Sequence, residues 1–178
     1  MCAIVASFDK KKLEELYKLN AYRGELIPET LISELADGSY YITHTQAPTT
    51  EADNIHPAVY GNCYLWHNGI IKQKSLSPGT WDTQWLQEQI LSYGWSSLSR
   101  IDGTFACLMY NVNDLFVFRN EISPMYYDKA LNFSSTRFNN SISLPPNIVY
   151  KINLQYQAID AVAYFDTFEN PYYIPETT

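Results

Sequence analysis

Met1-Cys2-Ala3-Ile4-Val5-Ala6-Ser7-Phe8-Asp9 opens the chain, and this stretch decides how the fold begins. Residues 2–8 form a continuous apolar run with the length and β-branched content of a buried strand. Asp9 stops the run and stands where an N-cap is expected for a helix over residues 10–20, in which apolar residues recur at i, i+3 and i+4. The stretch therefore predicts a buried strand followed directly by an amphipathic helix.

Cys2 is the position best suited to catalysis, because removal of Met1 would make it the N-terminal residue. A cysteine attacks as its thiolate, and an adjacent free α-amine, with an ordinary pKa of about 7.7 to 8.0, can accept the thiol proton near neutral pH. Nucleophile and base then belong to one residue, and no separate histidine is required. Taken alone, Cys2 is better explained as the plain start of a strand, so the rest of the sequence has to decide between these interpretations.

Length and composition restrict the possibilities. With 178 residues that are 46% hydrophobic, the chain is long enough for one well-buried domain, which we expect to span residues 1–178, with an irregular tail over 169–178. The net charge of −7 and the lack of Lys/Arg clusters argue against binding to nucleic acid or an anionic membrane. No apolar run approaches the roughly 18 residues of a membrane span, and the start lacks a signal segment. We expect a cytoplasmic protein.

The three cysteines show no metal-ligand spacing, so neither a metal nor another cofactor is expected. Cys63 and Cys107 lie in apolar runs, where buried thiols are usually inert. A papain-like pairing of either thiol with His44 or His67 stays open as an alternative, although it fits the sequence less well.

The remaining pattern is dominated by strands. A second helix is expected over residues 83–93, with Asp82 as its N-cap. Strands are expected over residues 38–45, 59–66, 104–110, 115–119, 125–128, 131–134, 148–154 and 158–165. Several of these runs are apolar on both faces, as in sheets that are covered on both sides. The sequence thus predicts two stacked sheets with helices outside, an αββα sandwich.

Several short segments in a particular order carry a family resemblance. They are Cys2, Tyr22-Arg23-Gly24, His44-Thr45, Asn54-Ile55-His56-Pro57, His67-Asn68-Gly69-Ile70-Ile71 and Asp82-Thr83, followed by Ile101-Asp102-Gly103-Thr104-Phe105-Ala106, Phe118-Arg119-Asn120-Glu121, Phe133-Ser134-Ser135 and Leu144-Pro145-Pro146-Asn147. Together they resemble the class II glutamine amidotransferase domain, the glutaminase part of asparagine synthetase, glucosamine-6-phosphate synthase and amidophosphoribosyltransferase. This family belongs to the N-terminal nucleophile hydrolases. The resemblance implies an α+β fold, a four-layer αββα sandwich of two mainly antiparallel sheets.

The resemblance also implies a catalytic set. Cys2 would attack the γ-carboxamide carbon of glutamine, with its own α-amine as the base, and release ammonia and then glutamate. The side-chain amide of Asn68 and the backbone N–H of Gly69 would form the oxyanion hole. By themselves, Asn68-Gly69 would indicate an ordinary turn.

Substrate-binding roles follow in the same way. Asp82 resembles the carboxylate that binds the substrate α-ammonium group, and a role as helix N-cap is compatible with this. His56 resembles a histidine near the substrate carboxylate, with an exposed loop histidine as the equal alternative. Arg23 fits a loop over the glutamine pocket, and Thr49 falls among the substrate-binding positions. His44 and His67 are expected to be structural.

Two positions depart from the family pattern. Gln46 stands where the family has an arginine that binds the substrate α-carboxylate, so a charged bidentate contact has become a neutral one. Either glutamine binds more weakly, or the substrate is another amide without a free α-carboxylate. Ala3 replaces the usual glycine beside the nucleophile.

We therefore expect a stand-alone glutaminase subunit that hydrolyses glutamine and supplies ammonia to a synthetase on another chain, because none of the family's acceptor-domain motifs occurs in this sequence. The first alternative is an N-terminal-cysteine amidase for a different amide. The second is a non-catalytic relative that serves as a binding or scaffold subunit.

Overall fold

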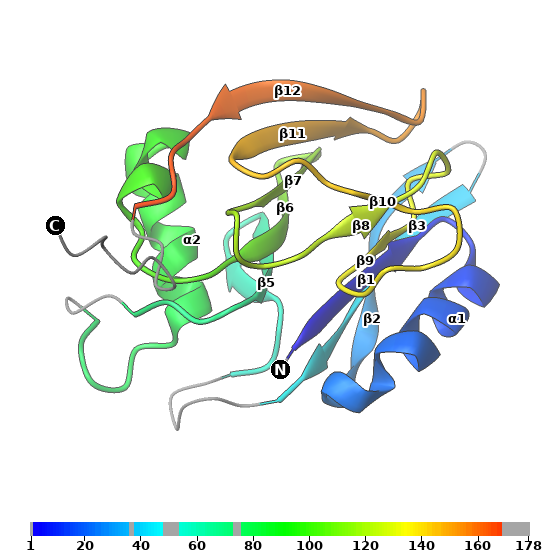
Figure 1. Ribbon diagram of the computed structural model, residues 1–178, viewed down its shortest axis with the longest axis horizontal. Helices are drawn as coiled ribbons and strands as arrows, with labels where there is room; N and C mark the ends of the chain where they lie inside the picture. Colours follow the sequence, from blue (N-terminus) through cyan, green and yellow to red (C-terminus); the bar gives the residue numbers. More distant parts are fainter. Residues whose placement is uncertain (1, 36–37, 48–53, 73–75, 169–178) are drawn as a thin grey trace, which may run out of the picture.

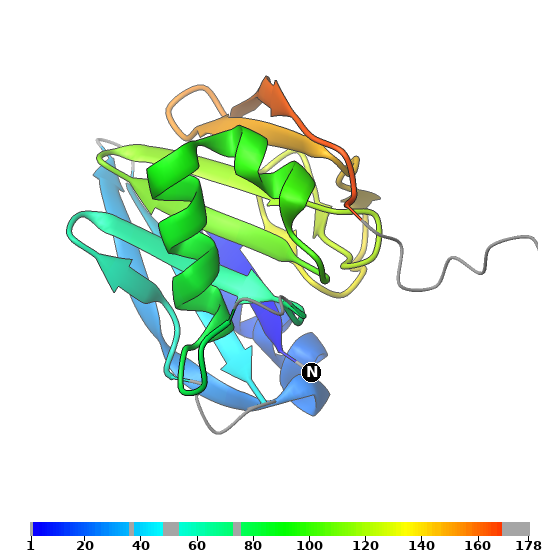
Figure 2. The ribbon, with the colours of Figure 1, turned by 90° about the vertical axis from the view of Figure 1, so that its left-hand side faces the viewer.

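The computed structural model describes residues 2–35, 38–47, 54–72 and 76–168 of the chain. Within these ranges the strands form two six-stranded sheets, one on either side of a shared interior (Figure 1). Every strand pair is antiparallel. The helices lie on the outer faces (Figure 2).

The first sheet, sheet A, has the strand order β10-β8-β9-β1-β3-β2. Its strands are β1 (Ala3–Ser7), β2 (Glu25–Leu35), β3 (Gly38–Gln46), β8 (Tyr126–Tyr127), β9 (Phe133–Ser134) and β10 (Ile142–Ser143). The N-terminal strand β1 therefore lies inside this sheet, between β3 and β9, with all five of its residues buried.

The second sheet, sheet B, has the order β12-β11-β7-β6-β5-β4. It consists of β4 (Ala58–Tyr60), β5 (Cys63–Asn68), β6 (Ala106–Asn111), β7 (Asp114–Arg119), β11 (Ile148–Asn153) and β12 (Ala158–Tyr164). The helical segments are α1 (Lys10–Asn20), α2 (Asp82–Tyr93) and the short 3-10 turns η1 (Ala21–Arg23) and η2 (Trp95–Arg100).

Alternating side chains of the inner strands serve two different interfaces. On β1, Ile4 faces the interior between the sheets, whereas Val5 packs on Leu13 and Leu16 of α1. On β6, Leu108 joins the interior between the sheets, whereas its neighbours pack under α2. Because successive side chains of a strand point to opposite faces, strands covered on both faces must be apolar throughout. The predicted four-layer αββα sandwich is confirmed.

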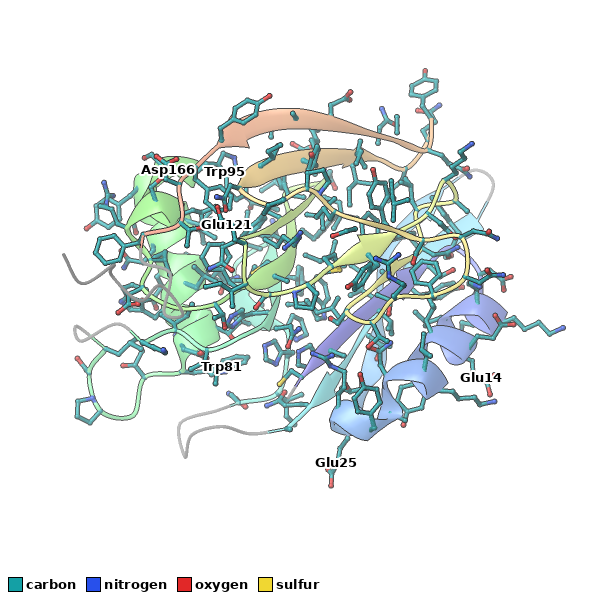
Figure 3. The ribbon with its side chains drawn as sticks, viewed as in Figure 1. Glu14, Glu25, Trp81, Trp95, Glu121 and Asp166 are labelled. Atoms are coloured by element: carbon teal, nitrogen blue, oxygen red, sulfur yellow. The ribbon has the colours of Figure 1, made fainter. Side chains whose placement is uncertain are left out.

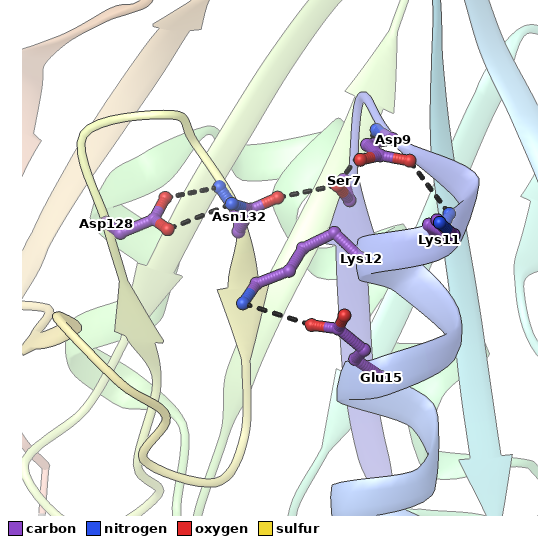
Figure 4. Close-up of polar contacts among 7 residues, drawn as sticks. All are labelled: Ser7, Asp9, Lys11, Lys12, Glu15, Asp128 and Asn132. Atoms are coloured by element: carbon purple, nitrogen blue, oxygen red, sulfur yellow. Dashed lines mark hydrogen bonds and ion pairs between the residues drawn. The ribbon is translucent and has the colours of Figure 1, made fainter.

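The start of α1 agrees with the sequence prediction in detail. The Asp9 carboxylate accepts from Lys11 N at 2.8 Å, while the Asp9 backbone N–H donates to Ser7 Oγ at 3.0 Å. Ser7 in turn donates to Asn132, whose side-chain amide donates to Asp128 (Figure 4). The helix cap is thus connected through Ser7 to the loop before β9, and it fixes the direction in which the chain leaves β1.

Two predictions about strands need correction. The strand expected over residues 59–66 is instead the hairpin of β4 and β5, because Gly61 adopts a φ of +55° in a two-residue turn. The long strand β2 was not predicted. Its pairing with β3 shifts register between Ile27 and Thr30, around Pro28, and its place at the edge of sheet A is where a strand tolerates proline.

In the part of the chain that the structure describes, no helix is both long and apolar enough to cross a membrane. The expected irregular tail over residues 169–178 lies outside the described residues.

Candidate active site

Cys2 immediately precedes β1, at the end of this strand where sheet A meets the loop after β3. Its side chain is partly buried, and Sγ donates to the Ala47 carbonyl oxygen at 3.5 Å. Arg23 Nε donates to the Cys2 carbonyl oxygen at 2.9 Å. The predicted loop residue Arg23 therefore contacts the main chain of the candidate nucleophile, which keeps the start of β1 in a defined position.

Gly24 permits a close approach between two of these segments. A Cβ at this position would lie 2.5 Å from the Gln46 carbonyl carbon and 2.8 Å from Ala47 N, which is closer than side chains come to a backbone. The turn after η1 thus packs directly on the end of β3, beside the carbonyl that accepts from Cys2. The requirement at Gly24 is space, because its φ of 162° is ordinary extended backbone.

Ser135 connects β1 with Asn68. Its hydroxyl accepts from Ile4 N at 2.9 Å, and its own N–H donates to the Ile4 carbonyl at 3.0 Å. Asn68 Nδ2 reaches the same hydroxyl at 3.5 Å. Asn68, the last residue of β5 in sheet B, and Ile4 of β1 in sheet A therefore both contact the hydroxyl of Ser135. The role of Ser135 was not predicted, although it belongs to one of the segments that carry the resemblance.

Gly69 follows Asn68 in a conformation that favours glycine, with a φ of +145°. A Cβ here would lie 2.6 Å from the carbonyl carbon of Thr104 and 3.0 Å from His67 Nε2. Thr104 also binds the next residue twice, since its N–H donates to the Ile70 carbonyl at 2.9 Å and its hydroxyl accepts from Ile70 N at 3.0 Å. The turn after β5 is thereby fixed against the segment before β6.

Asp82 occupies a different position from the one expected for an N-cap. The helix α2 begins at Asp82 itself with Trp81 as N-cap, and no side chain caps it. The Asp82 carboxylate instead accepts from Ile71 N at 3.1 Å. The partly exposed carboxylate is thus oriented by the segment that follows Asn68 and Gly69, and the N-cap prediction was wrong.

Gln46 is buried, and both ends of its side-chain amide are used within the protein. Nε2 donates to the Asn54 carbonyl at 2.5 Å. Oε1 accepts from His56 N at 3.2 Å and lies 2.9 Å from His56 Nδ1. Gln46 therefore connects the end of β3 to the loop before β4.

His56 is buried rather than exposed, so the alternative of a solvent-exposed loop histidine was wrong. Its Nε2 lies 3.1 Å from Thr83 Oγ1, and the same hydroxyl lies 3.1 Å from His67 Nδ1. The His56 ring also packs edge-on against Trp81, which lies at the start of α2 (Figure 3). Burial, together with the neighbouring His44 and His67, holds the pKa of His56 well below its ordinary value.

His44 and His67, which the sequence predicted to be structural, are both buried and hydrogen-bonded within the protein. His44 Nε2 donates to the His67 carbonyl at 3.1 Å, and its ring stacks on that of His56 with centroids 3.8 Å apart. Burial lowers the pKa of His44 to about 3. All three histidines of the chain therefore gather between β3, β5 and the start of α2. Their proximity was not predicted, since no sequence signal couples them.

The other two cysteines are poor candidates for the nucleophile. Both are buried, which raises the pKa of the Cys63 thiol and raises that of Cys107 well above its ordinary value. Cys2 is the partly exposed thiol of the three. Thr49, the remaining predicted substrate-binding residue, lies outside the described residues.

The fold is similar to that of known enzymes of solved structure, whereas no family model and no curated protein matches the sequence. One such structure is glutamine phosphoribosylpyrophosphate amidotransferase from B. subtilis in complex with ADP and GMP, with a TM-score of 0.63 and 16% identity over 91% of this chain and 49% of that one. Another is described as the allosteric regulatory enzyme of purine biosynthesis, with a TM-score of 0.60 and 16% identity over 91% of this chain and 48% of that one.

This chain therefore spans about half the length of either solved chain. At 16% identity the likeness establishes architecture. The chain shares its αββα fold with part of these solved enzymes, as the resemblance in its sequence implied.

Proposed function

We propose that this protein is an amide hydrolase of the glutaminase type, with Cys2 as its nucleophile after removal of Met1. One observation carries the proposal: Ser135 bonds the backbone of Ile4, two residues after Cys2 in sheet A, and its hydroxyl lies 3.5 Å from Asn68 Nδ2 at the end of β5 in sheet B. A nucleophile beside a pair of potential oxyanion donors is the minimum that acyl transfer requires.

The proposed reaction has two halves. Cys2 Sγ bonds to the carboxamide carbon, its proton passes through the α-amine to the leaving nitrogen, and the C–N bond breaks to release ammonia and leave a thioester. Water then adds to the thioester, the C–S bond breaks, and the carboxylic acid product leaves with the thiol restored. The Asn68 side-chain amide and the Gly69 N–H stabilise the oxyanion in both halves.

The proposed substrate is free glutamine, bound through its α-ammonium group by Asp82. Two facts support this choice: Ile71 N orients the Asp82 carboxylate beside the Asn68-Gly69 turn, and the similar solved enzyme is named as a glutamine amidotransferase. Arg23, His56 and Thr49 remain proposed substrate-binding residues. Delivery of the ammonia to a synthetase on a separate chain stays a prediction, which glutamate release with and without candidate partners would test.

The proposal is tested by mass spectrometry combined with a glutamate-release assay. We expect Met1 to be absent, a diazoketone or chloroketone analogue of glutamine to label Cys2 alone, and Cys2→Ala to abolish glutamate release without changing the fold. Cys63→Ala serves as a matched control and should remain active. Labelling of Cys63 or Cys107, or full activity with Met1 retained, would contradict the mechanism.

A second candidate is an amidase for a substrate without a free α-carboxylate, and the contacts of Gln46 favour it. The two ends of this side-chain amide bond Asn54 and His56, so an anionic group would meet no positive charge at this position. The rate of ammonia release from glutamine, from its α-amide and from short glutaminyl peptides separates the candidates. Preference for free glutamine supports the first candidate, and preference for the blocked substrates supports the second.

A further inference from the structure

A chain of four hydrogen bonds runs through the buried histidines. It begins at Gln46 Oε1, passes through His56, Thr83 and His67, and ends at the Thr104 carbonyl oxygen. The four successive donor–acceptor distances are 2.9, 3.1, 3.1 and 3.1 Å. Each of the five residues therefore contacts the next through ring nitrogens, a hydroxyl or a carbonyl oxygen.

Both ends of this chain can only accept. A backbone carbonyl has no proton, so Thr104 must receive one from His67 Nε2. Gln46 Oε1 must likewise receive one from His56 Nδ1, because the orientation of the amide is fixed: Nε2 faces the Asn54 carbonyl, and Oε1 also faces the His56 backbone N–H.

The neutral side chains then supply too few protons for the four hydrogen bonds. Four hydrogen bonds need four protons, whereas a neutral His56, the Thr83 hydroxyl and a neutral His67 supply one each. Without a fourth proton, one contact would bring two lone pairs face to face in a buried site, where an unsatisfied polar contact costs about 1 to 3 kcal/mol.

We propose that this chain of hydrogen bonds holds one extra proton at neutral pH and that His67 carries it as an imidazolium. His67 thereby acts as a positioning residue for Asn68 and Gly69. Both ring N–H groups of His67 then donate, one to Thr104 and one to Thr83, and the Thr83 hydroxyl donates onward to His56 Nε2. His56 stays neutral with its proton on Nδ1, and all four bonds are made.

The surroundings favour His67 over His56 as the site of the charge. The His56 ring stacks on His44, and burial opposes its protonation. His44 itself stays neutral, with its single ring proton directed to the His67 carbonyl. Other titratable groups on the surrounding elements are Cys107, the register partner of His67 on β6, and Asp82 on α2, next to Thr83 in sequence.

The position of His67 connects this proton to the proposed chemistry. Its Nε2 would lie 3.0 Å from a Cβ at Gly69, so the ring covers the backbone of the turn. Through Thr104 it also fixes Ile70, which Thr104 binds twice. A charged His67 therefore locks the conformation of residues 68–70 and adds positive potential where an oxyanion would form.

Nuclear magnetic resonance of the ring nitrogens tests the proton directly, and the three histidines make assignment simple. With ¹⁵N-labelled histidine at pH 7, we expect one ring protonated on both nitrogens, and it should be His67. His44→Gln and His56→Gln identify the other two rings. Three neutral rings in the wild type would overturn the proposal.

Thr83→Val and Thr83→Ser provide the matched pair. Valine removes the hydroxyl, so the neutral rings can keep their outer bonds and no fourth proton is needed; we expect every ring to become neutral. Serine retains the hydroxyl, and the doubly protonated ring should persist. A doubly protonated ring in Thr83→Val would overturn the proton count. Should Thr83→Val fail to fold, the wild-type and serine spectra still decide.

The positioning role rests on the proposed function and has its own readout. Thr83→Val should lower kcat about tenfold or more with little change in KM, and Thr83→Ser should restore it. Unchanged kcat in Thr83→Val would refute the positioning role while leaving the proton in place. Absence of glutamate release from the wild type would refute the proposed function, whereas the spectra would stand.

Discussion

The two sheets position their parts of the candidate site in different ways. On sheet A, Cys2 is held through main-chain groups: its carbonyl accepts from Arg23, its thiol faces the Ala47 carbonyl, and Ser135 brackets the backbone of Ile4. On the sheet B side, side chains bind side chains, and the links between His56, Thr83 and His67 depend on their chemical identity.

This difference indicates which part of the candidate site tolerates changes of side chain. On the Cys2 side one partner of each hydrogen bond is a main-chain group, which every residue type supplies, provided that the backbone path is kept, as Gly24 keeps it. A hydrogen-bonded set of side chains has no such freedom, because each replacement leaves a buried partner unsatisfied. We therefore expect the nucleophile side to be sensitive to backbone shape and the histidine side to be sensitive to protonation.

Gly69→Ala should have the largest effect, because the added methyl group clashes with the backbone. The added Cβ would meet the Thr104 carbonyl carbon at 2.6 Å, and the φ of +145° is strained for alanine. We expect the free energy of unfolding to fall by roughly 3 kcal/mol or more and the amidase activity to be lost, as measured by urea denaturation and ammonia release.

Gly79→Ala is the control for this experiment. Gly79 also has a positive φ, of +82°, but a Cβ added there would meet nothing within 4 Å. The substitution should cost only about 1 kcal/mol. Equal losses for the two variants would show that backbone conformation, and not the contact with Thr104, is the limiting feature.

Asn68→Ala should have the next largest effect and tests whether a side chain matters at the junction of the two sheets. Loss of one oxyanion donor should reduce kcat by on the order of 100-fold with little change in KM. Asn62→Ala, in the exposed β4–β5 turn, removes an amide from the same hairpin and should leave kcat unchanged. An intact kcat in Asn68→Ala would mean that the oxyanion is stabilised elsewhere.

The smallest effect is the pH dependence of stability that comes from His44, which lies on β3 of sheet A and stacks on His56. His44 has a pKa of about 3 in the folded protein and an ordinary value of 6.5, so only the unfolded chain binds a proton at this residue between these limits. Stability should therefore be lost as pH falls below 6.5 towards 3, by about 1.4 kcal/mol per pH unit for this group. His44→Gln should show a correspondingly shallower slope between pH 6 and pH 5. Parallel slopes for the two proteins would contradict a neutral, buried His44.

The sequence predicted those elements whose pattern is complete within a few neighbouring residues. β1 and α1 are examples, because the apolar run, the Asp9 cap and the helical periodicity follow one another directly. The sequence predicts one strand in place of the β4–β5 hairpin, since the turn is only the dipeptide Gly61-Asn62 inside an apolar segment. β2 was missed because Pro28 argues against a strand unless the edge position is known.

The residues of the candidate site also fall into those that the sequence indicates and those that only the packing of the sheets brings together. The resemblance drew attention to Cys2, Asn68, Gly69 and Asp82, and the structure places Asn68 beside β1 and Asp82 beside the Asn68-Gly69 turn. The cluster of histidines could not be predicted, because its contacts join β3, β5 and α2, and only packing of the two sheets determines which side chains meet. The catalytic and substrate-binding roles remain predictions for the variants above.

The central place of β1 in sheet A has a consequence for how the protein is made. β1 pairs with β3 on one side and with β9 on the other, so Val5 finds Ser134 as its partner only after about 130 further residues exist. At a synthesis rate of roughly 5 to 20 residues per second, that interval is on the order of ten seconds. During this interval the start of the nascent chain lacks one of its two neighbouring strands and is still open to the enzyme that removes initiator methionine. The proposed removal of Met1 can thus precede completion of the sheet that later buries β1.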